Sequence, residues 1–66
     1  MRFSSVLKEL MKASGYTQTA LAVKLGTTQQ TVSRWLKGIN QPDFETLFVL
    51  CKVLDSTPNE LLGWEE

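Results

Sequence analysis

The sequence predicts an all-α protein, folded as a compact bundle of five short helices. Apolar residues recur at helical spacing, and no segment shows the sustained alternation expected of a strand. A Ser, Thr or Asp stands near the start of each apolar stretch, and glycine follows three of these stretches, at positions 15, 26 and 38. A chain of 66 residues buries only about 60% of its unfolded surface, so its architecture must be simple. We therefore expect one domain over residues 1–66.

The first two predicted helices are separated by a glycine. The first has apolar residues at i, i+3, i+4, i+7 and i+8, namely Phe3, Val6, Leu7, Leu10 and Met11. Ser4 or Ser5 can cap this helix, and Gly15 ends it. Thr17 is expected to cap the second helix, which Gly26 stops. The predicted apolar face of the second helix is Ala20, Leu21 and Leu25, beside the small Ala22.

The third predicted helix begins at Thr27 or Thr28 and runs to Lys37, and a glycine then takes the left-handed cap position. Thr27 and Gln30 have the spacing of a capping box. Asp43 is a suitable cap for the fourth helix. The apolar face of that helix is predicted to consist of Phe44, Leu47, Leu50, Cys51 and Leu54.

The fifth predicted helix has a strong start signal. A capping residue, a proline at the first helical position and a capping-box glutamate follow one another: Thr57, Pro58 and Glu60. This helix carries Leu61 and Leu62. Cys51, on the preceding helix, is interpreted as a small core residue in preference to a reactive thiol.

Composition argues against several classes of function. The chain has one cysteine and no histidine, so we predict no disulfide, no metal site and no cofactor. No nucleophile has an evident base partner and no phosphate-binding glycine loop is present, so we expect neither an enzyme nor a small-molecule pocket. The longest apolar run is far shorter than the roughly 20 residues that span a bilayer. Without an export signal either, we expect a cytoplasmic protein with no membrane contact.

The charges of this chain are segregated although its net charge is zero. Residues 1–38 contain six basic residues and one acidic residue, whereas residues 39–66 contain six acidic residues and one basic residue. If the two halves face different ways, one face attracts phosphate and the other repels it. Chance segregation of surface charges is the alternative interpretation.

The second and third predicted helices fulfil the demands of a helix-turn-helix unit over residues 17–37. Ala22 is small enough for a close helix crossing, and Gly26 permits an abrupt turn. Val32 and Trp35 are three residues apart and can anchor the inner face of the third helix. For Trp35, stacking on a base is the alternative to a place in the core.

Three segments of the chain resemble the Cro/repressor type of helix-turn-helix protein (lambda-repressor-like, XRE family). They are YTQTALAVKLGTTQQTVSRWLKG, then PDFETLFVLCKVL, then TPNELL. The resemblance covers nearly the whole chain and implies a five-helix bundle, with residues 43–64 completing the core. It also implies a small bacterial or phage transcriptional regulator, a repressor, that binds double-stranded DNA as a homodimer on a two-fold symmetric operator.

The third helix is expected to enter the major groove. Stepping 100° per residue from Val32 places five polar side chains outward or in the exposed first turn: Gln29, Gln30, Ser33, Arg34 and Lys37. The first four are expected to contact bases. A solvated polar surface would also account for the two glutamines. The resemblance implies that Gln18 bonds a phosphate and steadies Gln29. The expected phosphate contacts are Thr17, Gln18, Thr28, Lys37, Asn40 and Gln41. The loop after the helix, Ile-Asn-Gln, lacks the basic residue common in the family, which implies weaker phosphate anchoring.

A dimer interface is predicted at the apolar cluster of Leu61, Leu62 and Trp64, because a chain this small cannot bury all three. Trp64 folding back over its own core is the alternative, and the loop at Ile39 or the outer face of the fourth helix are other possible interfaces. A different function also stays open. The acidic second half would suit a helix-turn-helix module that binds protein, such as an antitoxin or a factor that contacts RNA polymerase.

Overall fold

The computed structural model describes residues 3–62, which form five α-helices and, within that range, no strand. The helices are α1 (Phe3–Ser14), α2 (Gln18–Leu25), α3 (Gln29–Leu36), α4 (Phe44–Val53) and α5 (Pro58–Leu62). They form a compact body with a Cα radius of gyration of 10.6 Å. The predicted all-α five-helix fold is confirmed.

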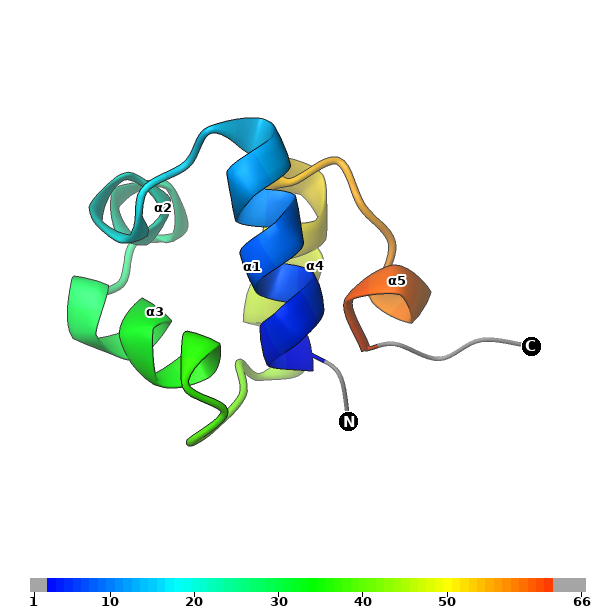
Figure 1. Ribbon diagram of the computed structural model, residues 1–66. Coiled ribbons are helices and arrows are strands. Elements are labelled where there is room, and N and C mark those ends of the chain that lie inside the picture. The colour runs from blue at the N-terminus through cyan, green and yellow to red at the C-terminus, as the bar shows by residue number, and fades with distance from the viewer. Residues whose placement is uncertain (1–2, 63–66) are drawn as a thin grey trace.

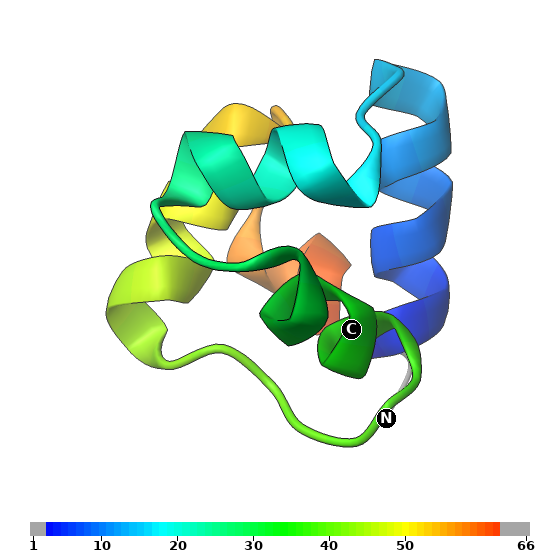
Figure 2. The same cartoon turned by 90° about the vertical axis from the view of Figure 1, so that its left-hand side faces the viewer.

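The core lies where the five helices meet, and each helix supplies one fully buried side chain: Leu7, Leu21, Val32, Leu50 and Leu61. Helix α1 packs against α3 and α5, α2 packs against α3 and α4, and α4 packs against α5. Figure 1 shows α2 and α3 at one end of the molecule and α5 at the other. In the perpendicular view, α1 and α4 lie at opposite edges, with α2 and α3 nearest the viewer (Figure 2).

Three helix starts follow from the capping chemistry in the sequence. The hydroxyl of Thr17 accepts the N–H of Ala20 at 3.1 Å at the start of α2. The carboxylate of Asp43 accepts the N–H of Thr46 at 2.9 Å at the start of α4. At α5 the hydroxyl of Thr57 accepts a backbone N–H at 3.2 Å from the residue three positions on, whose carboxylate it also contacts. Each bond satisfies an N–H that a helix start otherwise leaves without a partner.

Other local predictions were wrong. Helix α1 already includes Ser4 and Ser5, so neither caps it. Helix α3 begins at Gln29 with Thr28 as its cap, and the predicted capping box of Thr27 does not form. The hydroxyl of Thr28 accepts the N–H of the residue three positions on at 3.2 Å, which leaves no capping role for Thr27. Helix α3 ends one residue earlier than predicted, with Lys37 as its C-cap.

Two residues assigned to apolar helix faces are exposed. Ala20 lies on the solvent side of α2. Phe44 is 76% exposed in the first turn of α4. The helix instead buries Leu47, Leu50, Cys51 and Leu54. Phe44 lies within about 20° of the buried Cys51 around the helix axis, so its exposure reflects its place in the first turn of α4 and not the helical repeat.

Candidate nucleic-acid interface

A left-handed glycine makes the turn that sets α3 against α2. Gly26 has φ 71° and ψ 31°, a conformation that costs other residues free energy because of their Cβ atom. The N–H of the next residue, Thr27, donates to the carbonyl of Ala22 at 2.9 Å and closes the end of α2. Ala22 is buried on α2, which packs against both α3 and α4. The predicted roles of Ala22 and Gly26 in the helix-turn-helix unit therefore match the geometry.

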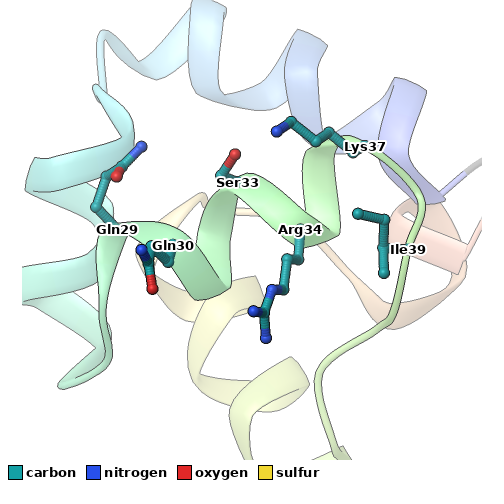
Figure 3. Close-up of a pocket in the computed structure, with 6 residues that line it drawn as sticks. All are labelled: Gln29, Gln30, Ser33, Arg34, Lys37 and Ile39. Carbon is teal, nitrogen blue, oxygen red and sulfur yellow. The ribbon is translucent and has the colours of Figure 1, made fainter.

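Helix α3 turns its two large apolar side chains into the core and its polar side chains outward. Val32 and Trp35 are buried, as predicted. The opposite side borders a shallow open depression lined by Gln29, Gln30, Ser33, Arg34, Lys37 and Ile39. Figure 3 shows these side chains projecting from α3 and from the start of the loop that follows it. The four residues expected to contact bases thus share one surface with Lys37.

A side-chain hydrogen bond joins the first residues of α2 and α3. The amide nitrogen Nε2 of Gln29 donates to Oε1 of Gln18 at 2.5 Å. This is the pair that the family resemblance implied. Because the bond consumes one donor of Gln29 and one acceptor of Gln18, it leaves the Oε1 acceptor of Gln29 and the Nε2 donors of Gln18 for other partners. It also fixes the direction of an otherwise mobile glutamine side chain.

The residues expected to contact phosphate line three depressions, except Thr28. Lys37 borders the same depression as the base-contacting set. Thr17 and Gln18 line a second depression on the α1 side, together with Lys8, Lys12 and Tyr16. Asn40 and Gln41 line a third depression, between the end of α2 and the start of α4. Thr28 is exposed and caps α3.

Sequence reasoning did not assign Lys8, Lys12 or Ile39 to this interface. The two lysines counted toward the basic half, but only the fold places them on the depression that Gln18 lines. Ile39 is 67% exposed and borders the base-contacting surface. It lies in the loop where members of the family often have a basic residue. That difference from the family pattern is the feature of the sequence that pointed to this position.

The predicted dimer cluster is not a single exposed surface. Leu61 is 0% exposed and belongs to the core of its own chain, because α5 packs back against α1 and α4. It therefore offers no apolar surface to a second copy. The side chain of Leu62 and all of Trp64 lie outside the part of the chain that the structure describes.

Among residues 3–62, the pKa values of two side chains are shifted, and both residues lie on α4 or at its start. Hydrogen bonds from the side chain and the backbone N–H of Thr46 lower the pKa of Asp43. Burial, followed by the nearby carboxylate of Glu60, raises the pKa of the Cys51 thiol. Over residues 3–62 there is no cluster of three or more His, Cys, Asp and Glu residues arranged to bind a metal. None of the helices in that range is long and apolar enough to cross a membrane.

Comparison with known proteins gives one family. The helix-turn-helix family model matches residues 7–61. The chain is 33% identical over 66 residues to the HTH-type transcriptional activator BcrR of Enterococcus faecalis, a match that covers 100% of this chain and 32% of that protein. It is 35% identical over 63 residues to the uncharacterized HTH-type transcriptional regulator YqaE of Bacillus subtilis (strain 168), covering 96% of this chain and 54% of YqaE.

A third relative is the HTH-type transcriptional regulator ImmR of Bacillus subtilis (strain 168), 32% identical over 66 residues, with 100% of this chain and 52% of ImmR covered. The chain thus spans between a third and about half of the length of these relatives. No solved structure gives a significant match to it.

Proposed function

This chain belongs to the helix-turn-helix family, and from that premise we propose that it binds a specific double-stranded DNA sequence with α3 in the major groove. The observation that carries the proposal is the hydrogen bond between Gln18 and Gln29 beside the exposed polar side of α3. An α-helix fits the major groove, where each base pair presents a distinct pattern of donors and acceptors. The hydrogen bond with Gln18 orders Gln29 at the start of α3, where its side chain would meet the edges of the base pairs.

The side chains on this surface suit particular bases. Gln29 and Gln30 can bond adenine N6 and N7, and Arg34 can bond guanine O6 and N7 with two parallel bonds. Ser33 lies between them and accepts or donates. The phosphate contacts that we propose around this set are Thr17, Gln18, Thr28, Lys37, Asn40 and Gln41, which hold the helix in register without selecting sequence.

We further propose that two copies bind a two-fold symmetric operator. One recognition helix covers only a few base pairs, which gives little selectivity against a genome. Two copies related by a two-fold axis place their helices in successive major grooves, about 34 Å apart. Repression is the regulatory role that we propose, since an occupied operator that overlaps a promoter blocks polymerase. Transcription of such a template in vitro should fall on addition of the protein, and a rise would assign activation instead.

Selection of bound duplexes from a random DNA pool tests the proposal. We expect enrichment of a palindromic site, and we expect Gln29→Ala and Arg34→Ala to alter its consensus. Lys24→Ala is the matched control, because this exposed basic residue borders none of the three depressions. Equal retention of every duplex would contradict sequence-specific binding. Complete absence of retention, on DNA and on heparin, would favour the protein-binding module.

A further inference from the structure

The outer face of α4 carries an apolar pair that no other described helix covers. Phe48 is 54% exposed and Val49 is 45% exposed. Glu45 and Lys52 are exposed on the same helix. These four residues follow the i, i+3, i+4, i+7 spacing, so they form one stripe along the helix, opposite its buried residues. We call them the α4 stripe: Glu45, Phe48, Val49 and Lys52.

The charges of the α4 stripe are complementary to those of an identical stripe that runs antiparallel to it. Along the helix the order is carboxylate, apolar, apolar, ammonium. In an antiparallel pair of identical stripes, Glu45 meets Lys52 of the second copy, and Phe48 meets Val49 of the second copy. A parallel pair would instead oppose like charges, which is unfavourable. Isologous two-fold contacts need this kind of self-complementary surface.

Neither charge of the stripe is already satisfied within residues 3–62. Glu45 and Lys52 form no ion pair with another described residue. They are also too far apart to pair with each other, since seven residues of α-helix rise about 10.5 Å. Within the described range, no opposite charge therefore competes with a partner that approaches along the helix.

We propose that the α4 stripe is the surface on which a second copy of this chain docks, with the two α4 helices antiparallel. The stripe has two exposed apolar side chains at its centre, a negative charge at one end and a positive charge at the other. The surface that fits it best is an identical stripe running in the opposite direction. Stable complexes typically bury about 1,200–2,000 Å² of total surface. A contact through one face of one helix buries less than this, so we expect a weak dimer in free solution.

The position of α4 makes this arrangement compatible with one operator. In Figure 2, α2 and α3 face the viewer while α4 runs along the left edge, across the line of sight. A half-turn about the line of sight therefore reverses α4 and leaves both α3 helices facing the same way. The placement of the two copies on DNA rests on the proposed function, whereas their docking through the α4 stripe does not.

Charge exchange tests the proposal without DNA. In sedimentation equilibrium at low salt, Glu45→Lys alone and Lys52→Glu alone should each weaken dimerisation about ten-fold, since either change reverses both ion pairs. The double variant Glu45→Lys/Lys52→Glu should return to the wild-type constant. Phe48→Glu should also weaken the dimer by more than about ten-fold, because it removes the central apolar contact. Val23→Glu, at another exposed apolar residue, should change nothing.

Helix content and melting temperature of each variant, measured by circular dichroism, check that these exposed substitutions leave the fold intact. A wild-type protein that stays monomeric at millimolar concentration would overturn the proposal. A dimer that ignores Phe48→Glu but is lost in Trp64→Ala would place the interface at the carboxyl end of the chain. Failure of the double variant to recover would overturn the antiparallel register. DNA binding is a separate measurement: loss of selective retention with an intact dimer would contradict the proposed function alone.

Discussion

At the scale of single residues, the outward side of α3 separates side chains that can select a base from side chains that can only hold the backbone. Arg34 lies one turn along the helix from Gln30, on the same exposed surface. Lys37 follows at the helix end, as its C-cap. A guanidinium fits the two acceptors of guanine, whereas a lysine beyond the last turn meets a phosphate as a point charge.

Arg34→Ala is expected to cost about 1–3 kcal/mol of binding free energy and to relax the preference at one base pair per half-site. Lys37→Ala should weaken all duplexes by similar factors and leave the preference unchanged. Competition binding against duplexes altered at one base pair at a time distinguishes the two effects. If the effects of the two substitutions were exchanged, or if Arg34→Ala also weakened all duplexes equally, Arg34 would be a phosphate contact.

At the scale of helices, the turn between α2 and α3 depends on backbone conformation rather than on space. A Cβ atom at Gly26 would meet no atom within 4 Å, yet φ there is +71°. Gly26→Ala should therefore lower the free energy of unfolding by about 1 kcal/mol, since L-residues resist the left-handed region. Urea denaturation measures the loss.

Gly26→Asn is the matched control for the turn, because asparagine adopts the left-handed conformation more readily than alanine. It should lose less stability than Gly26→Ala. Equal stability of the alanine variant and the wild type would show that the turn relaxes to another conformation. A much larger loss would point to a steric contact, which the open surroundings of Gly26 do not provide.

The cap of α4 should make this helix sensitive to acid. The pKa of Asp43 is lowered in the folded state by hydrogen bonds from Thr46. A lowered folded-state pKa stabilises the fold fully above the unfolded-state value near about pH 4, and this stabilisation is lost as the pH falls through the folded-state pKa. Asp43→Asn keeps an acceptor oxygen but has no charge to titrate.

The melting temperatures of the wild type and Asp43→Asn should therefore differ at pH 7, with the wild type more stable, and should converge below about pH 4. Thermal denaturation between pH 7 and pH 2 provides the measurement. The control is Glu9→Gln, at an exposed acidic residue of α1. A difference between the wild type and Asp43→Asn that persists unchanged in acid would mean that the cap acts through its hydrogen bond alone.

At the scale of the whole molecule, the basic and acidic halves of the sequence occupy different helices. The basic half contains α1, α2 and α3, and the acidic half contains α4 and α5. Because α2 and α3 lie at the opposite end from α5 (Figure 1), the proposed recognition surface would approach DNA with α5 directed away. A net charge of zero is therefore compatible with a DNA partner.

Salt dependence measures how many cations this surface places on phosphates. The logarithm of the binding constant should fall linearly with the logarithm of salt concentration, with a slope of about −0.9 for each phosphate neutralised. Lys37→Ala should reduce the magnitude of the slope by about 1, as should Lys12→Ala if the depression beside Gln18 receives a phosphate. Lys24→Ala, at an exposed lysine that borders none of the three depressions, should leave the slope unchanged. Binding that ignores salt would exclude the proposed contacts.

The sequence by itself determined the features that depend on neighbours a few residues apart. The caps at Thr17, Asp43 and Thr57 are bonds to the residue three positions on, so the local chain contains both partners. The inward direction of Val32 and Trp35 follows from helical periodicity in the same way. The pairing of Gln18 with Gln29 was available only through the family resemblance.

Tertiary structure alone decided which apolar and charged side chains remain exposed. Leu61 is buried because α5 folds back on α1 and α4, and Phe44 is exposed because α4 packs through its other residues. The lysines Lys8 and Lys12 line one depression with Gln18 only because the fold brings α1 beside the start of α2 and the end of α3. Local periodicity gives the relative directions of side chains on one helix. The rotation of that helix against its neighbours depends on the sum of contacts distant in the chain, which no short segment contains.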